Sequence, residues 1–239
     1  GLRQKQSQSK GMRIMSINVA IDGPAGAGKS TIAKKLAKEL DYIYVDTGAM
    51  YRAMALYMIE QKTDIQHMDA VRSACDAITI DIRYSDGEQQ VILNGRNVND
   101  FIRTEAVSEM SSKISAIPEV RAKLLSLQRS LAAASNVIMD GRDIGTVVFP
   151  KAELKILMTA DNAIRVQRRF KELNEKNPNV TIEEVKDNLE MRDYIDSHRE
   201  VSPLRKAKDA IELDNTNLTE KEQFSKALIL ARDKIAQLK

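Results

Sequence analysis

The sequence of 239 residues predicts an α/β protein with a five-stranded parallel sheet, helices on both faces of that sheet, and a small antiparallel insertion. Two observations predict the sheet. Short apolar runs alternate with longer stretches of helical periodicity, and a glycine-rich loop joins the first apolar run to the first helical stretch. A third observation predicts the insertion, because residues 77–102 read as strands of alternating polarity separated by the turns SDGE and LNGR.

Five apolar runs supply the strands of the parallel sheet. Helical stretches separate most of them, as the crossover connections of parallel strands require. Ligands of such sheets gather where the strands end, at their carboxyl edge. The predicted strands are residues 17–22, 42–48, 136–141, 154–160 and 210–214.

Helical periodicity is clearest after the first two strands and after the insertion. Residues 29–40 repeat apolar side chains at helical spacing, and the stretch that begins near Met50 does the same. Two more helices follow the insertion and meet at Pro118, which cannot continue a helix from the preceding turn.

These elements divide the chain into a core, an insertion and a tail. We expect the core in residues 16–66 and 103–239 and the insertion, a meander over the sheet edge, in residues 67–102. Residues 1–15 read as a polar tail, native or left over from expression, without a function. The polar segment at about 170–190, with NPN at its centre, reads as a mobile lid.

The charge balance argues against nucleic acid as a partner. The formal net charge of +3 comes from Arg3, Lys5 and Lys10, because the remaining 34 basic residues match the 34 acidic ones. A nucleic-acid binder should carry a basic excess on its folded part. We also expect no membrane contact and a cytoplasmic location, since no apolar run reaches the ~18 residues of a span and no secretory signal is recognisable.

Cysteine and histidine are scarce. Cys75 is the single cysteine, which excludes an internal disulfide and a cysteine-based zinc site, and it lies in a helical stretch where a packed thiol is expected. The two histidines, His67 and His198, do not have the spacing of metal ligands.

The glycine-rich loop GPAGAGKS, residues 23–30, follows a strand and opens a helix. Its backbone N–H groups are expected to surround phosphate oxygens at the positive end of that helix. Lys29 would then reach the β- and γ-phosphates, and the hydroxyl of Ser30 would bind Mg²⁺. An ordinary glycine-rich turn is the alternative, but here strand, loop and helix are all in place. The loop therefore predicts a nucleoside triphosphate, with ATP and Mg²⁺ as cofactors.

A phosphate-binding loop of this kind occurs in nucleotide switches, in motors and in kinases of small metabolites. No NKxD motif, which reads guanine, is present, and the chain is short for a motor. A kinase needs a second pocket that faces the γ-phosphate.

Arginines at predicted strand ends and on later helices supply candidates for that pocket. Three lie on one helical face with no acid between them, and another helix presents two arginines and an aspartate on one face. Each group alone reads equally as solvated surface, but their joint position favours a site for an anion such as a monophosphate. A phosphate dianion is itself a nucleophile, so no catalytic histidine is required. The residues are Arg52, Arg142, Arg165, Arg168, Arg169, Arg192, Asp196 and Arg199.

Four motifs together resemble the bacterial cytidylate kinases, in order and spacing: DGPAGAGKST, DTGAMYRA, DGRDIGTVVFP and RDYIDSHR. The resemblance extends from about Ile17 to the C-terminus. It implies transfer of the γ-phosphoryl group of ATP to CMP or dCMP with Mg²⁺, on a five-stranded parallel core with a meander insertion that binds the monophosphate and a short lid.

The resemblance also implies a role for each matching residue. Lys29, Arg142 and Arg192 would be catalytic, Ser30 and Asp140 would hold the metal, and the loop at residues 214–217 would border adenine. The ATP contacts would be Gly23, Pro24, Ala25, Gly26, Ala27, Gly28, Lys29, Ser30, Thr31, Arg165, Arg168 and Arg169, with the arginine over the transferring phosphoryl undecided. The acceptor contacts would be Thr47, Tyr51, Arg52, Ser112, Arg121, Arg142, Asp143, Arg192, Asp196 and Arg199.

Two other readings stay open. The chain could phosphorylate another small acceptor, such as UMP, AMP, dephospho-coenzyme A or shikimate, although Asp143 with Arg121 favours cytosine. It could also be a binding module that uses nucleotide as a switch without transfer. We expect a monomer, because no apolar stripe is left without a place in the fold.

Overall fold

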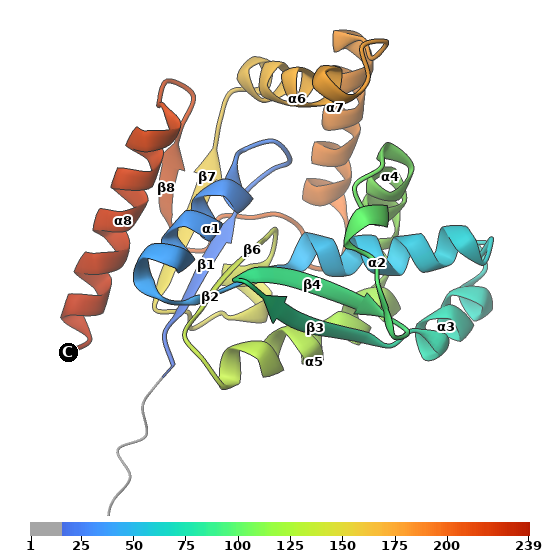
Figure 1. Cartoon of the computed structure of the whole chain (residues 1–239), viewed down its shortest axis with the longest axis horizontal. Coiled ribbons are helices and arrows are strands. Elements are labelled where there is room, and N and C mark those ends of the chain that lie inside the picture. Colours follow the sequence, from blue (N-terminus) through green and yellow to red (C-terminus); the bar gives the residue numbers. More distant parts are fainter. Residues whose placement is uncertain (1–15) are drawn as a thin grey trace, which may run out of the picture.

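The computed structural model describes residues 16–239, so the expected tail of residues 1–15 lies outside the described residues. Five parallel strands form the central sheet in the order β2-β6-β1-β7-β8 (Figure 1). All five predicted strands and the predicted fold class are therefore confirmed. The strands are β1 (Asn18–Asp22), β2 (Ile43–Asp46), β6 (Val137–Gly141), β7 (Leu154–Thr159) and β8 (Ile211–Asp214).

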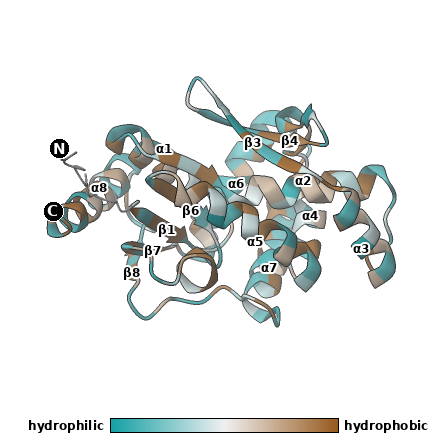
Figure 2. Ribbon diagram, turned by 90° about the horizontal axis from the view of Figure 1, so that it is seen from below, coloured by the Kyte–Doolittle hydropathy of each residue, from teal (hydrophilic) through white to brown (hydrophobic). Residues whose placement is uncertain are grey.

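Helices cover both faces of this sheet because strand side chains alternate between two apolar cores. On one face Val19, Ile21 and Ile138 pack against α1 (Lys29–Leu40) and α8 (Glu220–Gln237). The residues between them, Ala20, Val137 and Met139, face the opposite core. Figure 2 shows the hydrophobic residues concentrated on the central strands. The other face is covered by α2 (Thr47–Glu60), α4 (Glu105–Ile114) and α5 (Pro118–Ala133).

The helix boundaries follow local capping. β2 ends earlier than the predicted run of residues 42–48, because the side chain of Asp46 accepts a hydrogen bond from Ala49 N and so caps α2. Pro118 is the first residue of α5, where its missing N–H costs nothing. A turn of π-helix at Ile144–Val148, which the sequence did not predict, follows β6.

The segment between α2 and α4 contains α3 (Met68–Ala77) and a three-stranded antiparallel sheet. Its strands are β3 (Ile80–Ser85), β4 (Glu88–Leu93) and β5 (Arg96–Asn97), followed by a short 3-10 turn at Asn99–Phe101. This sheet confirms the predicted meander, and it lies beside α2 at the β2 edge of the central sheet (Figure 1). Cys75 is buried in α3, as expected of a packed thiol.

Two helices stand over the carboxyl ends of the strands, α6 (Asn162–Lys176) and α7 (Ile182–His198) (Figure 1). A small apolar cluster joins them to the phosphate-binding loop, with Val166, Val185 and Leu189 packed against Ala25. None of the helices within residues 16–239 is long and apolar enough to cross a membrane.

Candidate active site

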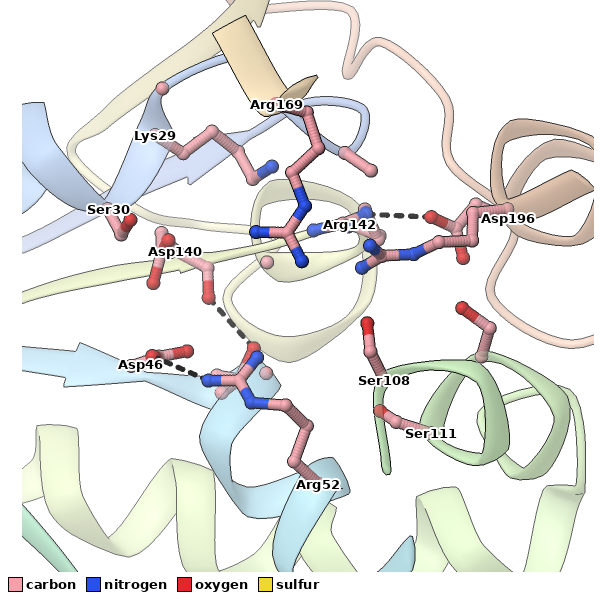
Figure 3. A pocket seen from close by; sticks show the side chains of 18 of the residues that line it. Lys29, Ser30, Asp46, Arg52, Ser108, Ser111, Asp140, Arg142, Arg169 and Asp196 are labelled. Atoms are coloured by element: carbon pink, nitrogen blue, oxygen red, sulfur yellow. Dashed lines mark hydrogen bonds and ion pairs between the residues drawn. The ribbon is translucent and has the colours of Figure 1, made fainter. Parts of the chain in front are cut away.

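A pocket of about 680 Å³ opens at the carboxyl ends of β1, β2 and β6 (Figure 3). Its walls come from the phosphate-binding loop, the first turns of α2, one face of α4, the loop after β6, and helices α6 and α7. The volume suits small-molecule ligands. The pocket lies at the carboxyl edge of the sheet, where the sequence predicts the ligands to gather.

The phosphate-binding loop requires glycine where the chain passes close to a neighbouring strand. A Cβ atom on Gly23 would lie 2.2 Å from the main-chain oxygen of Met158. Gly28, at a φ of 81°, precedes α1, and no side chain caps that helix. The N–H groups of the first turn are therefore left for another acceptor, which is the arrangement that binds phosphate oxygens.

Lys29 is buried beside this loop, where its Nζ donates to the carbonyl of Pro24 at 2.8 Å. Burial, and then repulsion from Arg142, lower the pKa of Lys29 to about 7, against the attraction of Asp140. Negative phosphate groups would restore the charged form, since they supply the counter-charge that the site lacks. Figure 3 shows the Lys29 amine pointing into the pocket.

Two carboxylates stand side by side at the ends of β2 and β6, because Asp46 and Asp140 are register partners. Burial, and then repulsion from Asp46, raise the pKa of Asp140 to about 7. A divalent cation would offset the repulsion between the two carboxylates. Mg²⁺ in kinase sites takes only one or two protein ligands beside phosphate and water. Ser30 and Asp140 both line the pocket, so these donors fit the ion.

Three arginines approach the pocket from different elements. Arg52 on α2 donates to Asp46 at 3.1 Å, and Arg142 donates through Nε to Asp196 at 2.8 Å (Figure 3). Arg192 makes no ion pair with any described residue, and burial followed by repulsion from Arg142 lowers its pKa to about 10. The Nε groups of Arg52 and Arg192 are buried without a partner among the described residues. Unpaired buried donors are costly, so these groups call for an anionic ligand.

A second polar wall lies toward α4 and α5. Arg121 donates to Asp143 and to the carbonyl of Ser115, and its guanidinium lies 5.2 Å from the ring centroid of Tyr51. Arg199, just beyond the end of α7, donates to Ser115 Oγ at 3.2 Å. Ser112 is buried in the same wall. Arginine and carboxylate here offer donors and acceptors together, as reading a base edge requires.

The three arginines of α6 have different partners. Arg165 is paired with Asp193 of α7 and donates to the carbonyl of Ala25. Arg168 donates to the side chain and main chain of Asn215. Their like charges are thus offset partly by the protein itself, which the sequence did not reveal. Of these three arginines, Arg168 and Arg169 line the pocket and Arg165 does not.

Arg169 lines the pocket, and its side chain points into it (Figure 3). Its guanidinium is paired with Glu105 of α4 at 2.8 Å and with Glu172 of its own helix at 3.1 Å. The pair with Glu105 joins α6 to α4 across the pocket.

The structure gathers most of the predicted residues around one pocket. Thr47 donates to the carbonyl of Asp140, and Asp196 is buried against Arg142. Sequence reasoning missed several polar residues that line the pocket, among them Asp46, Arg103, Ser108, Ser111, Ser115, Glu172, Lys176, Glu220 and Gln223. Asp46 could have been found, because it is an acid near the end of a predicted strand. Ser108 and Ser111 are single serines on a helix face and carry no such signal.

Asn215 shows why the loop at 214–217 matters. It is fully buried, and its amide donates to the carbonyl of Ala27 and to Gln223 of α8. Hydrogen bonds of Asn215 therefore join the loop after β8 to the phosphate-binding loop and, through Arg168, to α6.

A model of the cytidylate kinase family matches residues 19–233. The chain belongs to the cytidylate kinase family. A cytidylate kinase of Lactobacillus johnsonii is 49% identical over 219 residues, 92% of this chain and 95% of that protein. One of Flavobacterium johnsoniae is 49% identical over 225 residues, 92% of this chain and 98% of the relative. The resemblance drawn from four motifs is therefore confirmed, and the likeness covers nearly the whole cytidylate kinase chain.

The lowered pKa of Lys29 predicts proton uptake when ATP binds. At pH 8 a lysine with a pKa of about 7 is mostly neutral, and bound phosphates would raise that pKa above 8. Calorimetric titration with ATP in two buffers of different ionisation enthalpy should therefore report uptake of about one proton. Lys29→Met should abolish the uptake. Binding heats independent of buffer, or uptake that persists in Lys29→Met, would contradict this assignment.

Proposed function

We propose that this protein transfers the γ-phosphoryl group of ATP to CMP and dCMP, giving ADP and the cytidine diphosphate. The observation that carries the proposal is that Arg52, Arg142 and Arg192 line the same pocket as Lys29, with the buried Nε groups of Arg52 and Arg192 unpaired among the described residues. A single phosphate site would not need so many cations. Membership of the cytidylate kinase family, and the names of its relatives, support the same acceptor.

One side of the pocket holds the phosphates of ATP, and the other side holds the phosphate of the acceptor. Lys29 and the N–H groups at the start of α1 hold the β- and γ-phosphates of ATP, while Arg52, Arg142 and Arg192 hold the phosphate of the acceptor. Asp196 orients Arg142 through the ion pair at 2.8 Å and faces the acceptor ribose. Arginine suits this role because its planar fork matches phosphate oxygens.

The chemical step needs neutralisation of phosphate charge more than it needs a general base. An oxygen of the acceptor phosphate attacks the γ-phosphorus, and the bond from that phosphorus to the β-bridging oxygen breaks, with its electrons leaving on ADP. Two phosphates repel by about 4 kcal/mol per pair of unit charges at about 4 Å and an effective dielectric constant of about 20. Lys29, Arg142 and Arg192 offset that repulsion, and they also stabilise charge on the equatorial oxygens in the transition state.

Mg²⁺, when bound, would offset part of the negative charge of the ATP phosphates during transfer. Ser30 and Asp140 would hold it, Ser30 through its hydroxyl and Asp140 directly or through water. Asp46 stays with Arg52 on the acceptor side.

Cytosine is read by Asp143, Arg121 and Ser112, with Arg199 completing the wall. Cytosine presents a donating amino group at C4 and acceptors at N3 and O2, whereas uracil presents an acceptor at C4 and a donor at N3. A carboxylate accepts and an arginine donates, so Asp143 matches the amino group and Arg121 matches N3 and O2.

Among the α6 arginines, Arg169 contacts the transferring phosphoryl. Arg165 is committed to Asp193 and Arg168 to Asn215, while Arg169 lines the pocket and points into it (Figure 3). Its carboxylate partners are partly exposed, so the phosphoryl group can displace them. Arg168 would then border the adenine end through the loop of residues 214–217.

The remaining parts serve these two sites. Residues at about 170–190 act as a lid over ATP and CMP together, residues 67–102 support the acceptor side, and residues 16–66 with 103–239 form the core. The protein works as a cytoplasmic monomer and binds no nucleic acid, in keeping with the balanced charge of the chain beyond its tail.

A panel of acceptors tests the proposed function. With ATP and Mg²⁺, the coupled release of ADP should be fastest with CMP and dCMP. Turnover with UMP should be lower by on the order of a hundredfold, because each of two mismatched base contacts costs about 1–3 kcal/mol. AMP, dephospho-coenzyme A and shikimate should also react more slowly, because none of them presents a cytosine. Faster turnover of another acceptor would overturn the cytidine assignment, and ATP hydrolysis without transfer would favour a nucleotide switch.

Asp143→Ala should shrink the preference for CMP over UMP. The change removes lone pairs that suit the cytosine amino group and oppose the uracil oxygen, so kcat/KM should fall far more for CMP than for UMP. Because Arg121 then loses its buried partner, Tm and the KM for ATP must be recorded as controls for folding. An equal fall for both acceptors would mean that Asp143 orients Arg121 and does not read the base.

Arg169→Ala should lower kcat by roughly a thousandfold, the effect of removing an arginine from a transferring phosphoryl group. Arg168→Ala is the matched control on the same helix face, and it should mainly raise the KM for ATP. A larger loss of kcat in Arg168→Ala than in Arg169→Ala would reverse the two roles.

A further inference from the structure

The edge of the central sheet next to the acceptor site is closed by side chains. β2 pairs only with β6, so one side of it has no neighbouring strand in the sheet of the described residues. Ile43 donates its N–H toward β6, to the carbonyl of Asn136. Because backbone groups alternate in direction along a strand, the N–H and C=O groups of Tyr44 and Asp46 point outward. An edge of this kind needs a partner or a cover.

The antiparallel sheet supplies that cover through two residues. Tyr84 of β3 and Gln89 of β4 are register partners. The hydroxyl of Tyr84 donates to the carbonyl of Tyr44 at 2.9 Å. Gln89 Oε1 accepts from Asp46 N at 2.9 Å, and its Nε2 donates to Asp46 O at 3.2 Å. A carboxamide carries the same donor and acceptor as a peptide group, so Gln89 pairs with Asp46 as a neighbouring strand would.

Asp46 is also the residue that holds the acceptor side together. One of its carboxylate oxygens accepts from Ala49 N and so caps α2, which carries Thr47 and Arg52 into the pocket. The other oxygen accepts from Arg52 at 3.1 Å and from Arg103 at 3.5 Å. Figure 3 shows Asp46 beside the guanidinium of Arg52, with a dashed line that marks their ion pair.

Arg52 depends on this single carboxylate. Its Nε is buried and unpaired among the described residues, and burial lowers the pKa of its guanidinium. Arg103 approaches the same carboxylate with a like charge. A small displacement of Asp46 would therefore turn the fork of Arg52 away from the acceptor phosphate, and misplacement of a positioning group weakens binding sharply.

We propose that Gln89, supported by Tyr84, is a positioning residue for the acceptor phosphate, acting through Asp46 on Arg52. The antiparallel sheet then takes part in acceptor binding without touching the acceptor. This inference rests on the proposed function, since it assigns the phosphate contact to Arg52. Asp46 also repels Asp140, but among the described residues no hydrogen bond joins Gln89, Asp46 or Arg52 to Lys29 or to the loop at residues 214–217. The KM for ATP should therefore depend on Gln89 much less than the KM for CMP.

The test compares Gln89→Leu with Gln90→Leu. Gln90 is the next residue of β4, and its side chain points to the other face of the hairpin, so it is a matched control. Gln89→Leu should raise the KM for CMP roughly five- to tenfold, the effect of about one hydrogen bond, with kcat and the KM for ATP within about twofold. Tyr84→Phe should shift the KM for CMP in the same direction by less, and Gln90→Leu should leave it unchanged.

A double-mutant cycle separates positioning from a general structural effect. In an Arg52→Ala background, Gln89→Leu should cause no further rise in the KM for CMP, because the group that it positions is gone. Three outcomes would each overturn this inference while leaving the proposed function in place. Gln89→Leu could behave like Gln90→Leu, its full effect could persist without Arg52, or the KM values for CMP and ATP could change in parallel. A parent protein that phosphorylates no cytidine nucleotide would instead overturn the proposed function, and this inference with it.

Discussion

The balance of charge at the ends of three parallel strands is the constraint on which the rest of the site depends. Register places Asp46 beside Asp140, and Asp22 beside Gly141, so three acids meet at one edge. Asp22 accepts from the N–H groups of Ile144 and Gly145, and burial raises its pKa to about 6. Asp22 thus holds the segment after β6 that begins with Arg142, and Asp46 pairs with Arg52. The charge of Asp140 attracts Lys29, so the acids offset the repulsion between the buried cations.

The ion pairs within the pocket divide into fixed and exchangeable ones. Arg165 with Asp193 is largely buried and fastens α6 to α7 and to the phosphate-binding loop. Arg169 with Glu105 is more exposed, and such pairs contribute only about 0–1 kcal/mol. Phosphate groups can therefore replace the second kind at little cost, while the first kind keeps the walls in place. Catalysis by this site rests on prearranged charge more than on a proton-transferring residue.

Much of the fold could be predicted from the sequence, because apolar periodicity and turn residues determine local structure. Strand alternation, the strand-loop-helix setting of residues 23–30 and the turns of the antiparallel sheet each depend on a few adjacent residues. The partners within the site could not be predicted. Asp193 lies 28 residues from Arg165, and Gln89 lies 43 residues from Asp46, so only the folded chain decides which charge or amide meets which.

The central claim is that one cluster of cations holds two nucleotides with their phosphates in line. Calorimetric titration with a compound that joins cytidine and adenosine through a chain of phosphates tests it most directly. If both nucleotides occupy the pocket together, this compound should bind roughly a hundredfold or more tightly than CMP or ATP alone, because its second half binds at a high effective concentration. An affinity no better than that of the tighter single nucleotide would contradict the account.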